Sequence, residues 1–387
     1  MVTQEETQFK YNTVLPSDSI LEWSHKHVYG FWPELLPYQD KIHIIYAGLN
    51  NSYSILARSD DSLILEIQEK IHEGKTNFIF ECLAEGFYDD LVLKLNNVVS
   101  EYDYVKFFLA ISDLQGDKTY DKFCLNKNIK KNLTIITASS FEKNFQNYNY
   151  FTQSYVTGKK DKKFLCFNKV PRQHRITLLN KLLELDLVKE SYYSFDATQS
   201  GFNIDELNDN FLALKQFKNR LPLKLNMTEE RSNPVDVRAE DLEYFNNSYF
   251  SIITETMFYD LNNRVPGNTY VHVPNISPGC FLSEKIFKPL ALNHPFIVVS
   301  TPNYLYNLRL RGYKTFSPYI DESYDTVEDD NLRMEYIVKE VTRLCSLSDQ
   351  ELINFTYNIQ PIVEYNSSLY KNVTDFAITK DVANSLI

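Results

Sequence analysis

Apolar and polar residues alternate along the first part of the chain in a way that predicts strands separated by helices. Short apolar runs at 41–47, 77–82, 104–111 and 133–137 have the length of buried strands. Between them, stretches 61–72 and 89–99 carry apolar residues three and four positions apart, which is typical of helices. Strands that alternate with helices indicate βαβ units and a parallel sheet.

Residues 138–163 are polar and aromatic, and the same alternation resumes after them. Strands are predicted at 163–167, 192–195 and 249–254, and helices at 171–185, 205–221 and 301–311. Gly312 suits the position just after a helix, and Ser348 with Glu351 matches a capping box that opens a final helix. We therefore expect two α/β domains, at 1–155 and 156–346. A helical extension is expected at 347–387, and one possible position for it is against the first domain.

Composition narrows the class of protein. The 387 residues are 43% hydrophobic and 24% charged, which is ordinary for two globular domains. The 27 Tyr, 26 Phe and only 10 Gly fit an AT-rich coding bias of the kind found in some viruses and bacteria. A net charge of −11 argues against nucleic-acid binding by the whole surface. The basic runs Lys127–Lys131 and Lys159–Lys163 are interpreted as solvated loops, with a DNA or other anionic acceptor surface as the alternative.

The compartment is predicted from cysteines and from apolar runs. Five dispersed cysteines without CxxC spacing fit reduced thiols better than disulfides or a zinc site. The first residues show no signal-peptide pattern, and no apolar run reaches the roughly 18–20 residues of a membrane helix. We expect a cytoplasmic protein without membrane insertion, located in the host cytoplasm if the source is a virus.

The stretch 281–299 carries the most informative chemistry. Ser283, Glu284 and Lys285 open a short apolar helix that leads directly into an apolar strand. Lys285 and Lys288 share one face near the positive end of this helix, which Pro289 should kink or shorten. An acid and a base at a helix N-terminus suit a ligand with a ribose and a diphosphate. This indicates a nucleotide-sugar site, with ordinary surface charges as the alternative.

Two further segments follow predicted strands. Asn168 precedes a turn and a helix start at which Arg172, His174 and Arg175 are expected to project toward an anion. Glu255 follows strand 249–254, at the edge where open α/β sheets bind ligands. A solvated basic turn and a surface glutamate are the alternative interpretations.

These three segments, taken in order, resemble the donor-binding half of α1,3-fucosyltransferase-type enzymes. The resemblance covers roughly residues 163–300, and Ser283-Glu284-Lys285 with the strand after it is its most specific part. The stretch 312–325 also looks like uncharacterised glycosyltransferase-like proteins of phages and large viruses. Thr256-Met257 departs from the family pattern, and the link between Thr256 and Phe281 is longer than usual, so fucose is not assumed as the sugar.

The resemblance implies a GT-B architecture, with two Rossmann-like domains facing across a cleft. The C-terminal domain would bind the nucleotide sugar, and the N-terminal domain would bind the acceptor. By position, Arg175 or Arg172 and Lys285 would bind the diphosphate, and Glu284 would bind the ribose. The implied activity is transfer of a sugar to a hydroxyl acceptor, such as a glycan. A non-catalytic binding module and a DNA-modifying glycosyltransferase are the alternatives.

The mechanism expected for such an enzyme is metal-independent and inverting. No Asp-x-Asp motif ends a predicted strand, so we expect no metal ion, and Arg and Lys side chains could stabilise the diphosphate leaving group. Inversion needs one general base from the first domain. Glu85, just after strand 77–82, is the first choice, Glu81 the reserve and Asp113 the third option.

Overall fold

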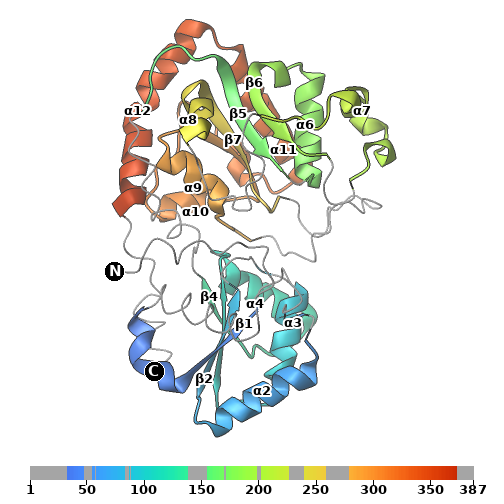
Figure 1. The fold of residues 1–387 in the computed structure, drawn as a ribbon, viewed down its shortest axis with the longest axis vertical. Helices are drawn as coiled ribbons and strands as arrows, with labels where there is room; N and C mark the ends of the chain where they lie inside the picture. Colours follow the sequence, from blue (N-terminus) through green and yellow to red (C-terminus); the bar gives the residue numbers. More distant parts are fainter. Residues whose placement is uncertain are drawn as a thin grey trace.

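The chain folds into two α/β units that lie one above the other along the long axis of the molecule (Figure 1). The computed structural model describes residues 33–47, 55–56, 58–82, 87, 89–137, 155–169, 171–197, 202–225, 239–258 and 279–372. Each unit contains a four-stranded sheet in which every pairing is parallel. This confirms the predicted α/β class with two Rossmann-like units. The exact domain boundaries remain a prediction.

The first unit has the strand order β1-β2-β3-β4. Its helices α2, α3 and α4 share one hydrophobic core with the strands, so they cover one face of the sheet. All six residues of β2 are buried, as expected of a central parallel strand. Its elements are η2 (Pro33–Lys41), β1 (Ile42–Tyr46), α2 (Asp60–His72), β2 (Asn77–Cys82), α3 (Asp89–Val98), β3 (Lys106–Ile111), α4 (Gly116–Lys127) and β4 (Thr134–Thr137).

The second unit is doubly wound, with the strand order β6-β5-β7-β8. The chain moves from β5 to β6 on one side and then returns to place β7 on the other side of β5. The order therefore reverses between β5 and β7. Its first elements are β5 (Lys162–Asn168), α6 (Gln173–Glu184), η3 (Val188–Glu190), β6 (Ser191–Phe195), η4 (Ile204–Glu206), η5 (Asp209–Phe211), α7 (Leu212–Phe217) and η6 (Lys218–Arg220).

The remaining elements complete this unit on both faces of its sheet. In Figure 1, α6 and α11 lie on one side of the strands, and α8, α9 and α12 lie on the other. These elements are α8 (Ala239–Asn246), β7 (Ser248–Thr254), α9 (Glu284–Ala291), β8 (Phe296–Val299), α10 (Tyr304–Leu310), η8 (Ser323–Thr326), α11 (Asp330–Ser346) and α12 (Asp349–Asn372).

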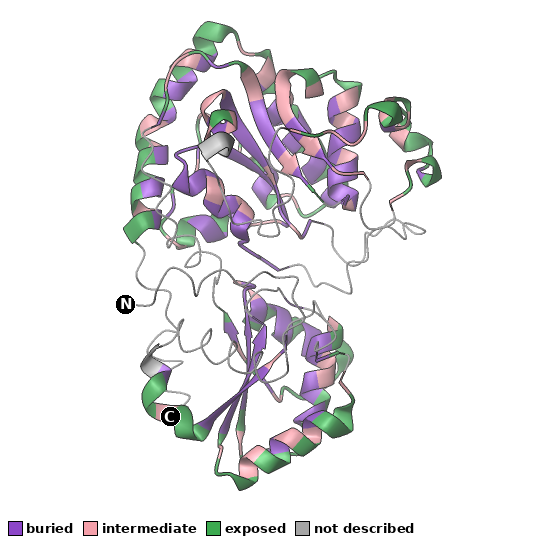
Figure 2. Ribbon diagram, viewed as in Figure 1, coloured by how far each residue is buried: buried purple, intermediate pink, exposed green. Residues whose placement is uncertain are grey.

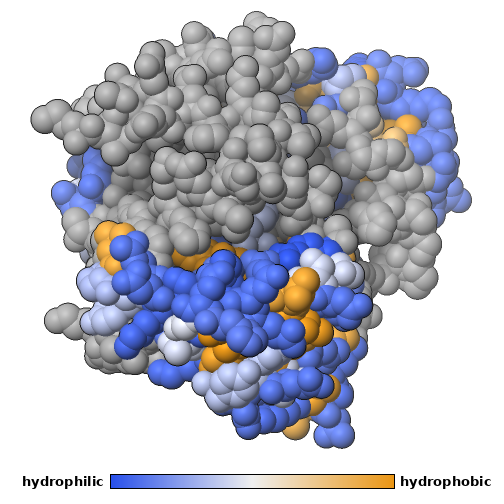
Figure 3. All heavy atoms as spheres, turned by 60° about the horizontal axis from the view of Figure 1, so that its bottom comes forward, coloured by the Kyte–Doolittle hydropathy of each residue, from blue (hydrophilic) through white to orange (hydrophobic). Residues whose placement is uncertain are grey.

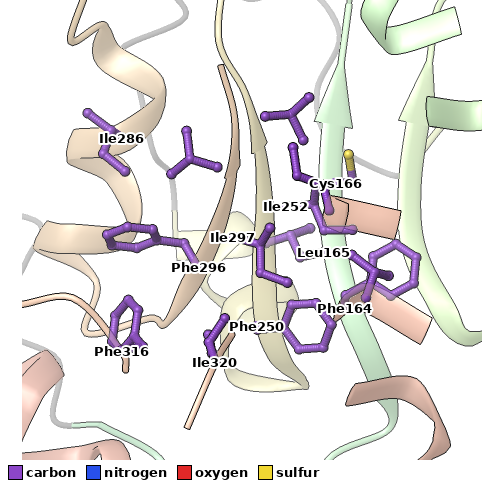
Figure 4. Packing of buried hydrophobic residues seen from close by; sticks show 14 of the residues in the cluster. Phe164, Leu165, Cys166, Phe250, Ile252, Ile286, Phe296, Ile297, Phe316 and Ile320 are labelled. Atoms are coloured by element: carbon purple, nitrogen blue, oxygen red, sulfur yellow. The ribbon is translucent and has the colours of Figure 1, made fainter. Parts of the chain in front are cut away.

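Aromatic and aliphatic side chains pack together in the core of the second unit (Figure 4). The rings of Phe164 and Phe250 stack between neighbouring strands with centroids 5.8 Å apart. Phe296 meets Phe316 edge to face at 4.9 Å, and Ile286 brings α9 onto the sheet. Burying side chains of this size is the main source of stability for such a layer.

Burial follows the layers of both units. The strands are mostly buried, and the outward faces of the helices are exposed (Figure 2). The described surface of the first unit that faces forward in Figure 3 is mainly hydrophilic, with hydrophobic side chains in separate patches. Within the described residues, no helix has the length and apolar character needed to cross a membrane.

The final helix packs on the second unit. Tyr370 of α12 stacks on Phe287 of α9 at 5.8 Å, and Ser367 Oγ donates to the Ala291 carbonyl at 3.1 Å. Residues 373–387, the rest of the predicted extension, lie outside the described residues. The capping box at the start of α12 is confirmed, because Glu351 N donates to Ser348 Oγ and Ser348 N donates to Glu351 Oε2.

The single helix predicted at 205–221 is wrong. This stretch contains three short 3-10 turns and the six-residue α7. Asn203 accepts a hydrogen bond from Asp205 N, and Asn208 accepts one from Asn210 N. Asparagine side chains that bond to nearby backbone in this way compete with helix formation.

The run Lys159–Lys163 is a solvated loop only in part, because Lys159 and Asp161 are exposed and Lys160 is buried. Lys162 and Lys163 belong to β5, and Lys159 forms an ion pair with Asp349 at 2.6 Å. Lys160 is only 7% exposed, and its Nζ donates to the Asn246 carbonyl at 2.7 Å. Burial lowers the pKa of Lys160 from its ordinary 10.5 to about 8. Lys160 is therefore withdrawn from any anionic acceptor, whereas the exposed Lys159 is paired with the exposed Asp349.

The buried Lys160 predicts a stability that rises at alkaline pH. Because its pKa is lower in the folded state, the unfolded chain binds more protons between pH 8 and 10.5. The free energy of unfolding of the wild type should rise across this range by up to about 3 kcal/mol relative to Lys160→Met. Urea unfolding of both proteins at several pH values measures this difference. Parallel curves for the two proteins would contradict the prediction.

Candidate functional site

The site is built around the point where the strand order of the second sheet reverses. Asn168 ends β5, and Thr254 ends β7 beside it. Thr254 Oγ1 donates to Asn168 Oδ1 at 2.6 Å, and Asn168 is only 3% exposed. Asn168 therefore joins the two strands at the edge where open α/β sheets bind ligands.

Glu255 is a buried carboxylate directly after β7. Its Oε2 accepts a hydrogen bond from Ser283 Oγ at 2.6 Å, and its Oε1 accepts one from Tyr304 OH at 2.6 Å. Burial raises the pKa of Glu255, although the nearby Lys285 ammonium and these two hydroxyls act in the opposite direction. The carboxylate thus connects the starts of α9 and α10 from inside the protein.

The first turn of α9 contains the expected acid and base, with Glu284 buried and Lys285 partly exposed. Ser283 is the N-cap, and its Oγ accepts a hydrogen bond from the Lys285 amide at 3.2 Å. Lys285 Nζ contacts Glu284 Oε1 at 2.6 Å and Ser283 Oγ at 3.1 Å. Burial alone would raise the pKa of Glu284, but the charge of Lys285 lowers it overall. Glu284 is therefore ionised, and the Lys285 side chain, 27% exposed, reaches the surface.

The three residues expected to project from the start of α6 do not all reach the surface. His174 is buried, and its Nε2 donates to the Glu255 carbonyl at 2.8 Å. Burial, followed by the charges of Arg175 and Arg172, lowers its pKa well below the usual value, so the ring is neutral. Arg175 is also buried, and its Nη2 donates to the Thr254 carbonyl at 3.1 Å.

Burial and the neighbouring Arg172 lower the pKa of Arg175 to about 10, so this side chain remains a cation. His174 and Arg175 consequently support the end of β7 from within. Arg172, the N-cap of α6, is half-buried and makes no side-chain cap hydrogen bond.

Positive charge gathers at this edge of the sheet. The charges of Arg172 and Lys285 both lower the pKa of His174, and the charges of Lys285 and Lys288 both lower the pKa of Glu284. With Arg175, these cations outnumber the carboxylates Glu255 and Glu284. An excess of cations beside a helix N-terminus favours an anionic ligand.

An aromatic stack that the sequence did not reveal lies behind His174. The ring of Phe258 stacks on the imidazole at 5.6 Å, and the Arg333 guanidinium lies 4.5 Å from the centre of the same ring. Arg333 Nη2 also donates to the Phe258 carbonyl at 2.7 Å. Phe258, Tyr304 and Arg333 carry no local motif, because their partners are distant in the sequence.

The carboxylates considered as general base lie on the first unit. Glu85 is outside the described residues, and the Glu81 side chain is buried within β2. Asp113, two residues after β3, is fully buried against residues 279 and 280. The assignment of the base therefore stays a prediction. In the described part of the chain, His, Cys, Asp and Glu side chains form no group of three that could hold a metal ion.

Comparisons with known proteins give only distant structural likenesses. No protein-family model matches the chain, and no curated protein matches its sequence. A DNA-modifying β-glucosyltransferase, solved with and without uridine diphosphoglucose, is 11% identical and has a TM-score of 0.30. The match covers 87% of this chain and 98% of that one.

Two other solved structures show similar likenesses. T4 phage BGT in complex with its UDP-glucose substrate is 9% identical with a TM-score of 0.31, over 87% of this chain and 99% of that one. The α,α-trehalose-phosphate synthase (UDP-forming) from Burkholderia vietnamiensis is 10% identical with a TM-score of 0.37, over 83% and 73%. Likenesses at this level do not assign the chain to a family.

The buried hydrogen bonds of Glu255 predict a clear stability effect. Glu255→Ala leaves the hydroxyls of Ser283 and Tyr304 without their acceptor, which should lower the free energy of unfolding by about 2–3 kcal/mol. Glu335→Ala, at an exposed position of α11, is the matched control and should change it by less than about 0.5 kcal/mol. Urea unfolding measures both variants. Equal small effects would show that Glu255 does not hold the two helix starts.

Proposed function

We propose that this protein is a glycosyltransferase that moves a sugar from a nucleoside-diphosphate sugar to an acceptor hydroxyl. The observation that carries the proposal is the start of α9, where Ser283, Glu284 and Lys285 lie beside the reversal point of a doubly wound sheet. The first-turn amides of α9 and the Lys285 ammonium suit a diphosphate. The ionised Glu284 can accept hydrogen bonds from the hydroxyl groups of a ribose.

The leaving group in this reaction is the nucleoside diphosphate. As the bond between the anomeric carbon and the phosphate oxygen breaks, negative charge grows on that oxygen. Lys285 and Arg172 would stabilise this charge, with Lys288 adding to the local potential. These cations support metal-independent transfer. His174 and Arg175 serve as buried supports of the site and do not contact the ligand.

The acceptor oxygen attacks the anomeric carbon from the opposite side, which inverts its configuration. A carboxylate of the first unit takes the proton of the acceptor hydroxyl as the new bond forms. We propose Glu85 for this role, with Glu81 as the reserve. The donor sugar is left open, because Thr256 and Met257 depart from the pattern of the fucosyltransferases that the sequence resembles.

The basic runs give DNA no advantage over a glycan or another acceptor. Lys160 is buried, and Lys159 is paired with Asp349. Lys127 ends α4, a helix that starts near the carboxyl end of β3 and leads to the amino end of β4. The run Lys127–Lys131 therefore lies toward the edge of the first sheet opposite the one where a ligand is expected.

Lys285→Ala should weaken nucleoside diphosphate binding. A screen of UDP, GDP, CDP and dTDP by thermal shift identifies the base that the wild type prefers, and calorimetry then gives its Kd. Loss of one charge-assisted contact to phosphate should raise this Kd by about 10–100-fold. Lys339→Ala, an exposed lysine of α11, is the control and should bind like the wild type. If none of the four nucleotides shifts the wild-type melting temperature, the proposal fails.

An activity assay separates a transferase from a non-catalytic module. Incubation with the donor sugar of the preferred base and a panel of hydroxyl acceptors should release the nucleoside diphosphate. Glu85→Gln should lower this release by at least about 100-fold while leaving the Kd within about twofold of the wild type. Tight donor binding without hydrolysis or transfer to any acceptor would favour a binding module built on the same fold.

A further inference from the structure

Among the described residues, a buried hydrogen-bonded contact links the two units next to the site. Asp113, two residues after β3 of the first unit, accepts a hydrogen bond through Oδ1 from the Cys280 amide at 2.9 Å. The Leu114 amide donates to the Cys280 carbonyl at 2.8 Å, and Asp113 pairs with Phe281 in an antiparallel bridge. A backbone segment of the second unit therefore adds on to the carboxyl end of a strand of the first.

A glycine makes this close approach feasible. A Cβ atom added to Gly279 would lie 1.7 Å from Asp113 Oδ2, which is far inside any allowed contact. Asp113 is fully buried, and its Oδ2 has no hydrogen-bond partner among the described residues. Its Oδ1 also accepts a hydrogen bond from the Gln115 amide at 2.9 Å. The carboxylate is thus held directly against the backbone of the second unit.

Apolar contacts flank this hydrogen-bonded contact. Met257 and Phe281 belong to the second unit in sequence, yet both are buried in the hydrophobic core of the first. On the other side, Thr301 Oγ1 donates to the Gly279 carbonyl at 2.7 Å. Residues 279–281 are consequently fixed from both units, and the N-cap Ser283 follows two residues later.

We infer that Asp113 is a positioning residue for the start of α9. It holds residues 279–281 in place, and through them it sets the position of Ser283 and the first-turn amides of α9. The hydrogen bonds that Asp113 accepts come from the backbone amides of Gln115 and Cys280, so it acts on the site through the backbone. Only the ligand-binding test of this inference rests on the proposed function. The placement of residues 279–281 can be measured without a ligand.

The ligand-free test is hydrogen exchange of backbone amides. In Asp113→Ala, the amides of Cys280 and Lys285 should exchange at least about tenfold faster than in the wild type, while Phe80 in β2 keeps its protection. Asp113→Asn should restore slow exchange, because its amide oxygen can accept from the same two backbone amides. Gly279→Ala, which forces the segment away from Asp113, should behave like Asp113→Ala and replaces it if that variant fails to fold.

Ligand binding gives the second readout. Asp113→Ala should raise the Kd of the nucleoside diphosphate that the wild type prefers by about tenfold, and Asp113→Asn should stay within about twofold. Asp103→Ala, an exposed carboxylate near the start of β3, is the control and should have no effect. The inference would be overturned if the Cys280 amide of Asp113→Ala exchanged as slowly as in the wild type. It would also be overturned if Asp113→Asn had the same fast exchange and weak binding as Asp113→Ala. A wild type that binds no nucleotide would refute the proposed function, and hydrogen exchange would still decide the role of Asp113.

Discussion

The arrangement of the second unit depends on the buried carboxylate of Glu255. A carboxylate removed from water is costly unless hydrogen bonds compensate it, so its two oxygens must find donors inside the protein. Ser283 and Tyr304 supply them, and this fixes the first turns of two helices at the edge of the sheet. The Glu255 carbonyl accepts a hydrogen bond from His174 Nε2, so the same residue also fixes the end of β7 relative to α6.

The arginine, lysine and histidine side chains near this edge divide into two groups by burial. His174 and Arg175 are inside the protein, where they bond to backbone carbonyls of β7 and of the residue after it. Arg172 and Lys285 keep part of their side chains at the surface, where a ligand can meet them. A rigid inner layer of this kind holds the outer cations in one geometry, which reduces the entropy lost when an anion binds. The contact at Asp113 extends the same support to the first unit.

The sequence predicts the parts of this structure that depend on neighbouring residues. Alternating apolar runs predict both parallel sheets, and the N-cap Ser283, the C′ residue Gly312 and the capping box at Ser348 lie where expected. These features form within a few residues of the chain, so local chemistry is sufficient to predict them.

The remaining features depend on contacts that no local pattern encodes. The turn at Asn168 predicts a helix start with cationic residues, but only the packing of α6 against β7 decides that His174 and Arg175 point inward. Arg333 meets the Phe258 carbonyl across 75 residues, and Asp113 meets Cys280 across 167. The prediction of one helix at 205–221 was wrong for a different reason. It followed the helical spacing of the apolar residues, whereas asparagine side chains bond to nearby backbone and interrupt the helix.

The most direct test of this account is the structure of the protein with its preferred nucleoside diphosphate bound. We predict that the diphosphate lies at the N-terminus of α9, with phosphate oxygens within hydrogen-bond distance of Lys285 Nζ and of the first-turn amides. The ribose hydroxyls should donate hydrogen bonds to Glu284. A diphosphate bound elsewhere on the second unit, or a nucleotide bound without contact to Lys285, would contradict it.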